Sequence, residues 1–463
     1  MEEQKHPTDI SALVAAQKSF FATGKTRDLA FRREQLQRLY QVIQDHSGEL
    51  EEVFRKEMNK GAFEAYSTEI GLVLEEIRFH LKHLRRWARP RRTPTPLLHF
   101  RASSRIVPEP YGTVLILSPW NYPFLLLFSP LIGALSAGNC VVLKPTSRLP
   151  MLAGLFGKII EKAFEPEYVT LLTGGHDVSS WLLEEPFDHI FFTGSTQVGR
   201  KVMAAAARHL TPVTLELGGK NPCIVHHDAH LEVAARRIVW GKFINAGQTC
   251  IAPDHLLVHE AVREKFIPHL IATLERFYGK DASKTDDLTR IVGKENVRRL
   301  AAFIREGKVL YGGHYDPDRH YVAPTLLDGI TPDHAVMQEE IFGPVLPLLT
   351  YRNEEELFRL TRRHPDPLAL YIFSRDRTFI SSALEKIPSG TVAINETVMQ
   401  FVHHHLPFGG RGKSGMGAYH GRFSFDTFSH YRGILDKKIR PDIPLRYPPY
   451  TSRHLKWIRR FLH

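Results

Sequence analysis

The hydrophobic pattern of the N-terminal part of the chain predicts helices. Between residues 10 and 88, apolar residues such as Leu72, Ile77 and Leu81 recur at helical spacings with charged residues between them, which is typical of amphipathic helices. The prolines within residues 90–96 end this region, because proline cannot continue a helix.

The pattern then changes to short aliphatic runs that alternate with helical segments. The first predicted strands are 113–117, 140–143, 169–172 and 189–192, with helices at 124–137, 151–164 and 177–183. A second set, from about 213 to 394, has strands at 223–225, 255–258, 346–349, 369–373 and 391–394, and helices such as 261–278 and 353–361. Such alternation favours parallel sheets with helices on both faces. We predict two doubly wound α/β lobes with a boundary near residue 210.

Composition supports a large folded chain and limits its chemistry. The 463 residues are 43% hydrophobic and 24% charged, which allows a large core and argues against disorder. Three cysteines without metal-ligand spacing give no disulfide framework and indicate a reducing compartment. Cys140 and Cys223 lie in apolar runs, so we expect them to be inert core residues.

Charge and the two ends of the chain bear on partners and location. Residues 1–5 are polar, and the longest apolar stretch, 124–135, is too short to span a bilayer, so we expect a cytoplasmic protein. The net charge of +11 comes from dispersed residues without a nucleic-acid-binding motif, and no nucleic acid partner is expected. The basic tail, 437–460, is expected to be a solvated face. Its end, 454–462, mixes aromatic and cationic residues, which leaves weak contact with a membrane surface open.

One cysteine and one glutamate suggest covalent chemistry on a carbonyl group. Cys250 follows a glycine at position 247 and a predicted helix, 231–244, and we expect helix dipoles there to favour its thiolate. Glu216 stands between two leucines and before Gly218-Gly219, where a buried carboxylate is unusual without a task. A nucleophile and a base are therefore predicted to act together.

Four further segments could bind an anion, a ribose or an oxyanion, although each is weak alone. Residues 191–199 read as a strand, a glycine turn and a helix start, which aims backbone N–H groups at an anion. Lys144 ends a predicted strand, where ligands of parallel sheets bind. Asn121 lies in a proline-stiffened loop, where a rigid amide could serve an oxyanion site. Glu340 and Phe342 stand just before a turn and could contact ribose hydroxyls and a flat ring.

Two other motifs do not support their obvious functions. Residues 412–414 resemble the end of a phosphate-binding P-loop, but Pro407 stands where that motif needs its first glycine. His403, His404 and His405 suggest a metal, but adjacent residues of an extended chain do not converge readily on one ion, and no matching carboxylate or cysteine cluster appears. No metal site is predicted.

Taken together, these segments resemble the aldehyde dehydrogenase superfamily. The matching segments cover nearly the whole chain in order: 119–121, 144–145, 192–195, 216–220, 247–250, 340–344 and 407–410. The short N-terminus and the segments 414–421 and 425–430 resemble the class 3 branch, which includes enzymes for fatty and medium-chain aldehydes.

The resemblance implies a fold and a role for each of the candidate site residues. It implies a Rossmann-like NAD(P)-binding lobe (1–210), a catalytic lobe (211–405) and a return segment (406–463) with an oligomerisation arm. Residues 89–108 would contribute to a small β extension that joins two subunits into a homodimer. It also implies that Cys250 is the nucleophile, Glu216 the general base, and Asn121 with the Cys250 N–H the oxyanion hole. Cofactor contacts would come from Ser118, Trp120, Lys144, Gly194, Ser195, Gly199, Glu340 and Phe342.

One departure and two alternatives remain. Many NAD-preferring relatives carry a glutamate three residues after the cofactor lysine, whereas this chain has Ser147 followed by Arg148. A carboxylate would repel a 2′-phosphate and these residues would not, so NADP is expected to be accepted as well as NAD. One alternative is an enzyme in which the acyl group, held on the cysteine as a thioester, is transferred to coenzyme A. The other is a non-catalytic, membrane-associated homologue. The loop 399–402 suggests an apolar aldehyde.

Overall fold

The computed structural model describes residues 7–442 and 444–461. The polar residues 1–5 and the last residue of the tail segment 454–462 therefore lie outside the described part. The N-terminal region is helical as predicted, and the apolar side of each longer helix is buried, as Leu36, Leu39 and Ile43 of α2 illustrate. Its elements are α1 (Pro7–Ala22), α2 (Leu29–Asp45), α3 (Ser47–Met58), α4 (Ala62–Ala65), a π-helical turn (Tyr66–Ile70) and α5 (Gly71–Trp87).

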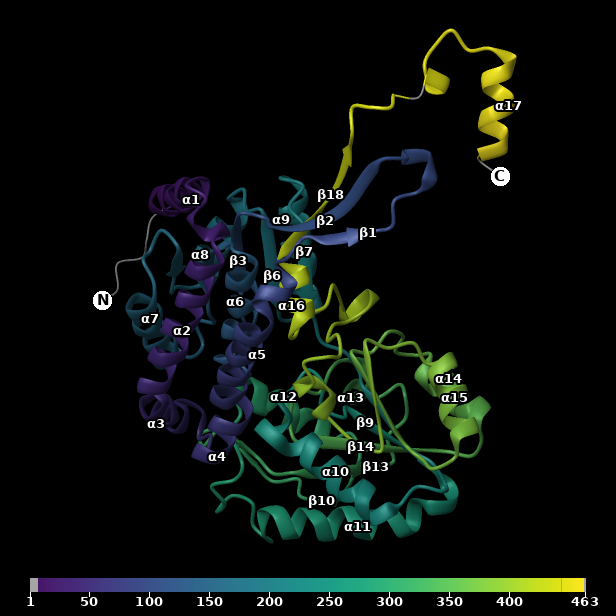
Figure 1. Cartoon of the computed structure of the whole chain (residues 1–463). Helices are drawn as coiled ribbons and strands as arrows, with labels where there is room; N and C mark the ends of the chain where they lie inside the picture. Colours follow the sequence, from purple (N-terminus) through teal and green to yellow (C-terminus); the bar gives the residue numbers. More distant parts are fainter. Residues whose placement is uncertain (1–6, 443, 462–463) are drawn as a thin grey trace.

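A six-stranded sheet forms the upper body in Figure 1, with the strand order β17-β7-β6-β3-β4-β5. Successive residues of β3 alternate between two cores: Val114 packs with α6 and α7, and Leu115 packs with α1, α8 and α9, so helices cover both faces. The strands are β3 (Thr113–Leu117), β4 (Cys140–Lys144), β5 (Val169–Leu171), β6 (His189–Thr193), β7 (Val213–Glu216) and the short antiparallel β17 (Gly415–Met416). The helices are α6 (Leu125–Ala137), α7 (Pro150–Ala163), α8 (His176–Glu184) and α9 (Thr196–Ala207).

Strand register brings four chain segments to one edge of this sheet. Leu117 of β3 pairs with Lys144 of β4, and Thr193 of β6 pairs with Glu216 of β7. The loops that follow these strands therefore meet at the carboxyl ends, the edge where open parallel sheets bind ligands.

A seven-stranded sheet forms the lower body, with the order β10-β13-β14-β9-β8-β15-β16. All its pairs are parallel except β10 with β13. Because β7 belongs to the first sheet, the chain changes sheets between Glu216 and Pro222, later than the boundary predicted near residue 210. The strands are β8 (Pro222–Val225), β9 (His255–His259), β10 (Lys308–Tyr311), β13 (Thr325–Asp328), β14 (Val345–Tyr351), β15 (Ala369–Phe373) and β16 (Thr391–Ile394); the helices include α10 (Leu231–Phe243), α11 (Glu260–Tyr278), α12 (Lys294–Ile304), α14 (Glu354–Thr361) and α15 (Arg377–Lys386).

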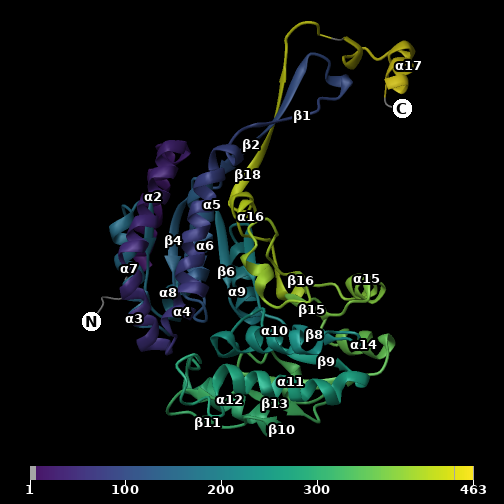
Figure 2. The ribbon, with the colours of Figure 1, turned by 60° about the horizontal axis from the view of Figure 1, so that its bottom comes forward.

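A third, three-stranded antiparallel sheet leaves the body as an arm (Figures 1 and 2). It consists of β1 (Arg91–Thr93), β2 (Ala102–Pro110) and β18 (Ser429–Lys437), and its β18 pairs with β2 along its whole length. The chain continues beyond β18 to a helix, α17 (Ser452–Phe461), at the far end of the arm. No helix within the described residues is both long and apolar enough to cross a membrane.

Candidate active site

Cys250 follows a left-handed turn. Helix α10 ends at Phe243, and Asn245, Ala246 and Gly247 then have φ values of 53°, 53° and 73°, a region that non-glycine residues seldom occupy. At Gly247, a Cβ would lie 2.3 Å from the carbonyl oxygen of Gly343. The turn therefore needs glycine at position 247, and it packs the Cys250 loop against the segment around Gly343.

Buried side-chain amides hold the Cys250 loop. Asn221 donates from Nδ2 to the carbonyl oxygens of Cys250 and Ala252, at 2.7 and 3.1 Å. Asn121 donates from Nδ2 to the Gln248 carbonyl at 2.9 Å. Because an amide Nδ2 carries two N–H groups, Asn121 keeps a second donor while it fixes the loop.

Glu216 ends strand β7 and lines the same cavity as Cys250. The residue is 3% exposed, and neither carboxyl oxygen has a hydrogen-bond partner among the described residues. Burial raises the pKa of Glu216 well above its ordinary value, because an apolar environment disfavours the charged form. A buried, unpartnered carboxyl beside a thiol is typical of a functional site.

The expected stabilisation of a Cys250 thiolate is wrong for the structure as it stands. Burial raises the pKa of the Cys250 thiol, and the neighbouring carboxyl groups of Glu340 and Glu216 raise it further. The physical reason is that burial and two neighbouring carboxyl groups both disfavour the negative charge of a thiolate, and Cys250 lies seven residues beyond the end of α10, too far for the helix dipole to act. The thiol therefore needs a base to take its proton.

A cavity of about 180 Å³ brings most of the predicted site residues together. They come from the loops after β3 and β6, from the end of β7, from the turn after α10 and from the segment before β14. The predicted residues that line it are Trp120, Asn121, Gly194, Ser195, Glu216, Cys250, Glu340 and Phe342.

Three predicted cofactor residues lie outside the lining of this cavity. Ser118 and Lys144 follow or end neighbouring strands, and the Ser118 N–H donates to the Lys144 carbonyl at 3.2 Å. Gly199 is buried in α9, and a Cβ there would lie 2.6 Å from Cδ2 of Leu217. The glycine at position 199 therefore serves the close packing of α9.

The edge of the first sheet fits an anionic dinucleotide. Ser195 caps α9, its Oγ accepting from the Val198 N–H at 3.4 Å, and such a helix start attracts phosphate. The rings of Trp120 and Phe342 meet edge to face, with centroids 5.3 Å apart. Lys144 is almost fully buried, and this burial lowers its pKa to about 8.

Glu340 is the second carboxyl group of the cavity. Its Oε1 has no hydrogen-bond partner among the described residues, and burial, with Asp254 nearby, raises the pKa of Glu340 to about 8. A Cβ at Gly218 would lie 2.0 Å from Glu340 Oε2. Glycine at position 218 thus makes room for this carboxyl, which is placed to accept from a ligand hydroxyl.

The segment expected to tolerate a 2′-phosphate is exposed. Ser147 is exposed, and Arg148 forms an ion pair with Glu295 at 2.7 Å. The guanidinium of Arg148 also lies 6.0 Å from the ring centroid of Trp120. Arg148 therefore lies next to an aromatic residue of the site, with a carboxylate already beside it.

A second, apolar cavity of about 410 Å³ also reaches Cys250. It shares only Cys250 and Leu126 with the first cavity, and no Asp, Glu, Lys or Arg is among the described residues that line it. The predicted loop 399–402 contributes three of its residues. The others include Phe63, Leu72, Tyr122, Leu125, Trp240, Ile244, Thr249, Ile251 and Val398.

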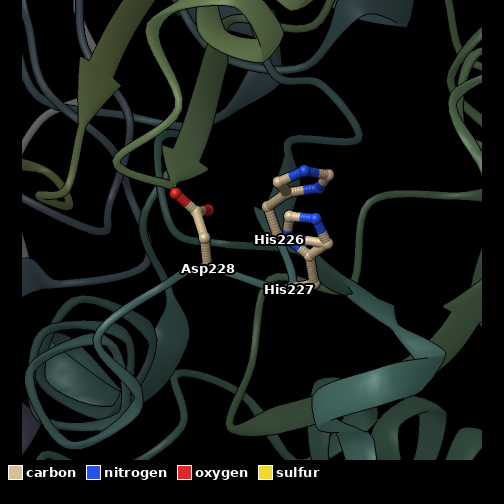
Figure 3. Close-up of side chains that lie close together, drawn as sticks. All are labelled: His226, His227 and Asp228. Atoms are coloured by element: carbon tan, nitrogen blue, oxygen red, sulfur yellow. The ribbon is translucent and has the colours of Figure 1, made fainter.

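One histidine cluster outside this site could approach a metal ion. Its side chains, whose ligand atoms lie within 4.8 Å of one another, are His226, His227 and Asp228. Figure 3 shows the carboxylate of Asp228 turned away from the two imidazole rings. Its oxygens accept hydrogen bonds from Ser374 Oγ and the Arg375 N–H, both at 2.8 Å. We assign this cluster a structural role.

Sequence reasoning missed the residues that hold the loops. The side-chain amides of Asn221 and Asn245 donate to backbone carbonyl oxygens, including those of the distant residues Ala252 and Asn121. Lys220 forms a buried ion pair with Asp254, whose Oδ2 accepts from the Ile341 N–H at 2.9 Å. These side chains form no periodic pattern along the chain. Lys220 lies in the family-like segment 216–220, but its partner could not be predicted from the sequence.

Comparison with known proteins identifies the class of this site. The sequence model of the Aldehyde dehydrogenase family matches residues 3–434. The chain is 44% identical to 4,4′-diaponeurosporen-aldehyde dehydrogenase of Staphylococcus aureus, over 96% of this chain and 97% of that one. It is 42% identical to a dimeric, NADP-preferring aldehyde dehydrogenase of Canis lupus familiaris, over 96% and 98%.

Solved structures agree. The substrate-bound state of Staphylococcus aureus AldH superposes with a TM-score of 0.96 at 43% identity, covering 98% of this chain and 99% of that chain. The chain belongs to the aldehyde dehydrogenase family and is an oxidoreductase that acts on aldehydes. Among the family's structures, an indole-3-acetaldehyde dehydrogenase is complexed with NAD⁺ and a glyceraldehyde-3-phosphate dehydrogenase with NADP. The cofactor of this enzyme is NAD or NADP.

Proposed function

We propose that the enzyme oxidises an apolar aldehyde to its carboxylic acid through a covalent intermediate on Cys250. The observation that carries this proposal is one cavity in which a thiol, an unpartnered carboxyl and a rigid amide converge. Cys250 gives its proton to the carboxylate form of Glu216, and the sulfur forms a bond to the aldehyde carbon.

Charge then develops on the aldehyde oxygen. The backbone N–H of Cys250 and the second N–H of Asn121 are the fixed donors for this oxyanion, and removal of one such donor typically costs about 3 kcal/mol of barrier stabilisation. NAD or NADP, when bound, supplies the acceptor for the hydride that leaves the carbon. Lys144, Ser195, Glu340 and Phe342 would hold it, and the acyl group remains on Cys250 as a thioester.

Glu216 completes the reaction by hydrolysis. After the proton from Cys250 has passed to solvent, the Glu216 carboxylate takes a proton from water and the water oxygen attacks the acyl carbon. The bond between that carbon and sulfur then breaks, and the sulfur takes up a proton as the Cys250 thiol is released. A raised pKa suits this role, because a stronger base removes a proton from water more readily. This base would be unnecessary if coenzyme A accepted the acyl group.

The main test uses Cys250→Ser. The variant should lose NAD(P)H production while it still binds cofactor; continued aldehyde oxidation would overturn the assignment of the nucleophile. Addition of coenzyme A to the wild type should yield no acyl-CoA. Acyl-CoA formation would support the acyl-transfer alternative.

The apolar cavity supports an apolar aldehyde as substrate. Its lining offers aromatic and aliphatic side chains and no charged group among the described residues, and its volume is typical of small-molecule sites. Rising kcat/KM along a series of aliphatic aldehydes is expected, and a preference for short, polar aldehydes would refute the assignment.

We also propose that NADP is accepted beside NAD. Position 147 carries an exposed serine, so no carboxylate at this position repels a 2′-phosphate. Comparison of kcat/KM for the two cofactors tests this: a preference for NAD above about a thousandfold, on the order of 4 kcal/mol, would contradict it.

A homodimer is the proposed assembly. β18 is an edge strand with mostly exposed residues, and edge strands are ready templates for pairing with another chain. Light scattering on the purified enzyme should give the mass of two chains, and a monomer at micromolar concentration would exclude this assembly.

The helix α17 supports peripheral contact with an anionic membrane. At 100° per residue, Leu455, Trp457 and Ile458 fall on one side, exposed by 49%, 42% and 36%, while Arg453, Lys456, Arg459 and Arg460 fall on the other. This distribution is typical of helices that lie in a membrane interface. Flotation with phosphatidylserine vesicles should retain the full chain and lose a variant truncated after residue 450; equal behaviour would refute a role for α17.

A further inference from the structure

Three charged side chains near the active-site loops have no part in the chemistry above: Lys60 and Glu69 are buried, and Glu64 is half-buried. Lys60 precedes α4, Glu64 lies in α4, and Glu69 lies in the π-helical turn. Lys60 Nζ and Glu69 Oε1 are 2.7 Å apart, and both side chains are completely buried. Because the desolvation of such a pair offsets much of its attraction, stability alone is a weak explanation for it.

Glu69 caps the helix that follows Asn121. Its Oε2 accepts from the N–H groups of Phe124 and Leu125, at 3.1 and 3.0 Å, and no side chain from the N-cap position does so. Burial raises the pKa of Glu69, but the ammonium of Lys60 and both N–H groups favour the carboxylate. Lys60 and the two N–H groups all donate hydrogen bonds to the Glu69 carboxylate. A glutamine at this position would turn its own NH₂ donor toward at least one of these donors.

Glu64 contacts the turn before Cys250. Its Oε1 accepts from the Asn245 N–H at 2.8 Å, and Asn245 begins the left-handed turn before Cys250. Residues 64 and 69 are five apart, a spacing that diverges on an α-helix but that a π-turn, with its i to i+5 hydrogen bonds, brings toward one face. The π-turn thus lets one short segment contact both active-site loops.

We propose that Glu69 is a positioning residue for Asn121 and Glu64 a positioning residue for the Cys250 turn. Through these contacts the segment 60–69 sets the distance between the oxyanion donor and the nucleophile. A misplacement of about 1 Å in such a site can cost about 10²-fold in rate. The inference rests on the proposed function, because it gives Asn121 the oxyanion role.

A double-mutant cycle tests the Glu69 assignment. Glu69→Gln and Asn121→Ala should each lower kcat/KM for the aldehyde, by about 10- to 100-fold for Glu69→Gln. If Glu69 acts through Asn121, the double variant should be no worse than Asn121→Ala alone. Multiplying losses would overturn the positioning role, whereas full activity of Asn121→Ala would instead overturn the proposed oxyanion hole.

Glu76→Gln is the matched control. Glu76 is 2% exposed; its Oε1 is hydrogen-bonded to His80 Nε2 at 3.1 Å and accepts from the Gly421 N–H at 2.8 Å, and its Oε2 lies 2.8 Å from His404 Nδ1. Glu76→Gln should lower the melting temperature without changing kcat/KM. If it lowered kcat/KM as much as Glu69→Gln does, the loss of any buried carboxylate would have this effect and the positioning role would be refuted.

If Glu69→Gln does not fold, the variants Glu64→Gln and Glu64→Ala test the positioning role of the segment 60–69. Glu64→Gln keeps an oxygen that can accept from the Asn245 N–H, whereas Glu64→Ala removes it. Glu64→Gln should therefore recover most of the kcat/KM that Glu64→Ala loses, and equal values for the two variants would refute the proposal.

Discussion

Replacing Gly247 by alanine should push the turn before Cys250 away from the segment around Gly343. The alanine would have to keep a backbone φ of 73°. Its methyl group would lie 2.3 Å from the Gly343 carbonyl oxygen, 2.5 Å from the Gly343 carbonyl carbon and 3.1 Å from the Lys242 carbonyl oxygen. The left-handed conformation costs about 1–2 kcal/mol for alanine. Overlap with backbone atoms, which no rotamer change relieves, adds about 1–3 kcal/mol.

The expected result is a total loss of about 2–5 kcal/mol of unfolding free energy, with a fall of about 100-fold in kcat/KM because the nucleophile moves. Denaturant unfolding and steady-state kinetics measure the two effects. Gly24→Ala is the matched control, because Gly24 is left-handed, with φ 75° and ψ 0°, and nothing lies within 4 Å of its Cβ position; it should lose only about 1–2 kcal/mol and keep its kcat/KM. Equal losses in stability and activity for the two variants would refute the close packing of Gly247 on Gly343.

Three further predictions concern the same site. Glu216→Gln should lose both the burst of NAD(P)H and the turnover, because the same carboxylate takes the proton of Cys250 and later that of water. Because the raised pKa of Glu216 means that the folded chain binds its proton more tightly, stability falls as pH rises above the unfolded carboxyl pKa, so the variant should melt above the wild type at pH 8. Lys144 has a pKa of about 8, so cofactor affinity in a fluorescence titration should weaken as pH rises through 8, and Lys144→Met should remove that dependence. Leu72→Trp should fill part of the apolar cavity and raise KM for long aldehydes while KM for acetaldehyde stays unchanged; a uniform rise would contradict the cavity as the substrate path.

The sequence predicted those parts of the fold that one continuous segment determines. The strands β3, β15 and β16 have the predicted bounds, because unbroken aliphatic runs between turns are typical of strands buried in a parallel sheet. The sequence indicated a change of lobe near residue 210, whereas β7 at 213–216 still pairs in the first sheet, because strand pairing between distant segments decides which sheet a short strand joins.

The site shows the same division. Cys250, Glu216 and Asn121 stand in recognisable motifs, and the structure places all three around one cavity. The pKa of Cys250 could not be predicted, because Glu340 and Glu216 approach it only in the folded chain. The apolar cavity combines Phe63, Trp240 and the loop 399–402, which share no local pattern.

The two cavities that share Cys250 and Leu126 have a kinetic consequence. A molecule in the apolar cavity leaves the other cavity open, so a substrate analogue and a cofactor analogue should inhibit at the same time rather than exclude each other. In a double-inhibition plot their lines should intersect instead of running parallel. Intersecting lines would show that the enzyme exchanges one ligand while it retains the other. An inhibitor that spans both cavities would have to pass the sulfur of Cys250.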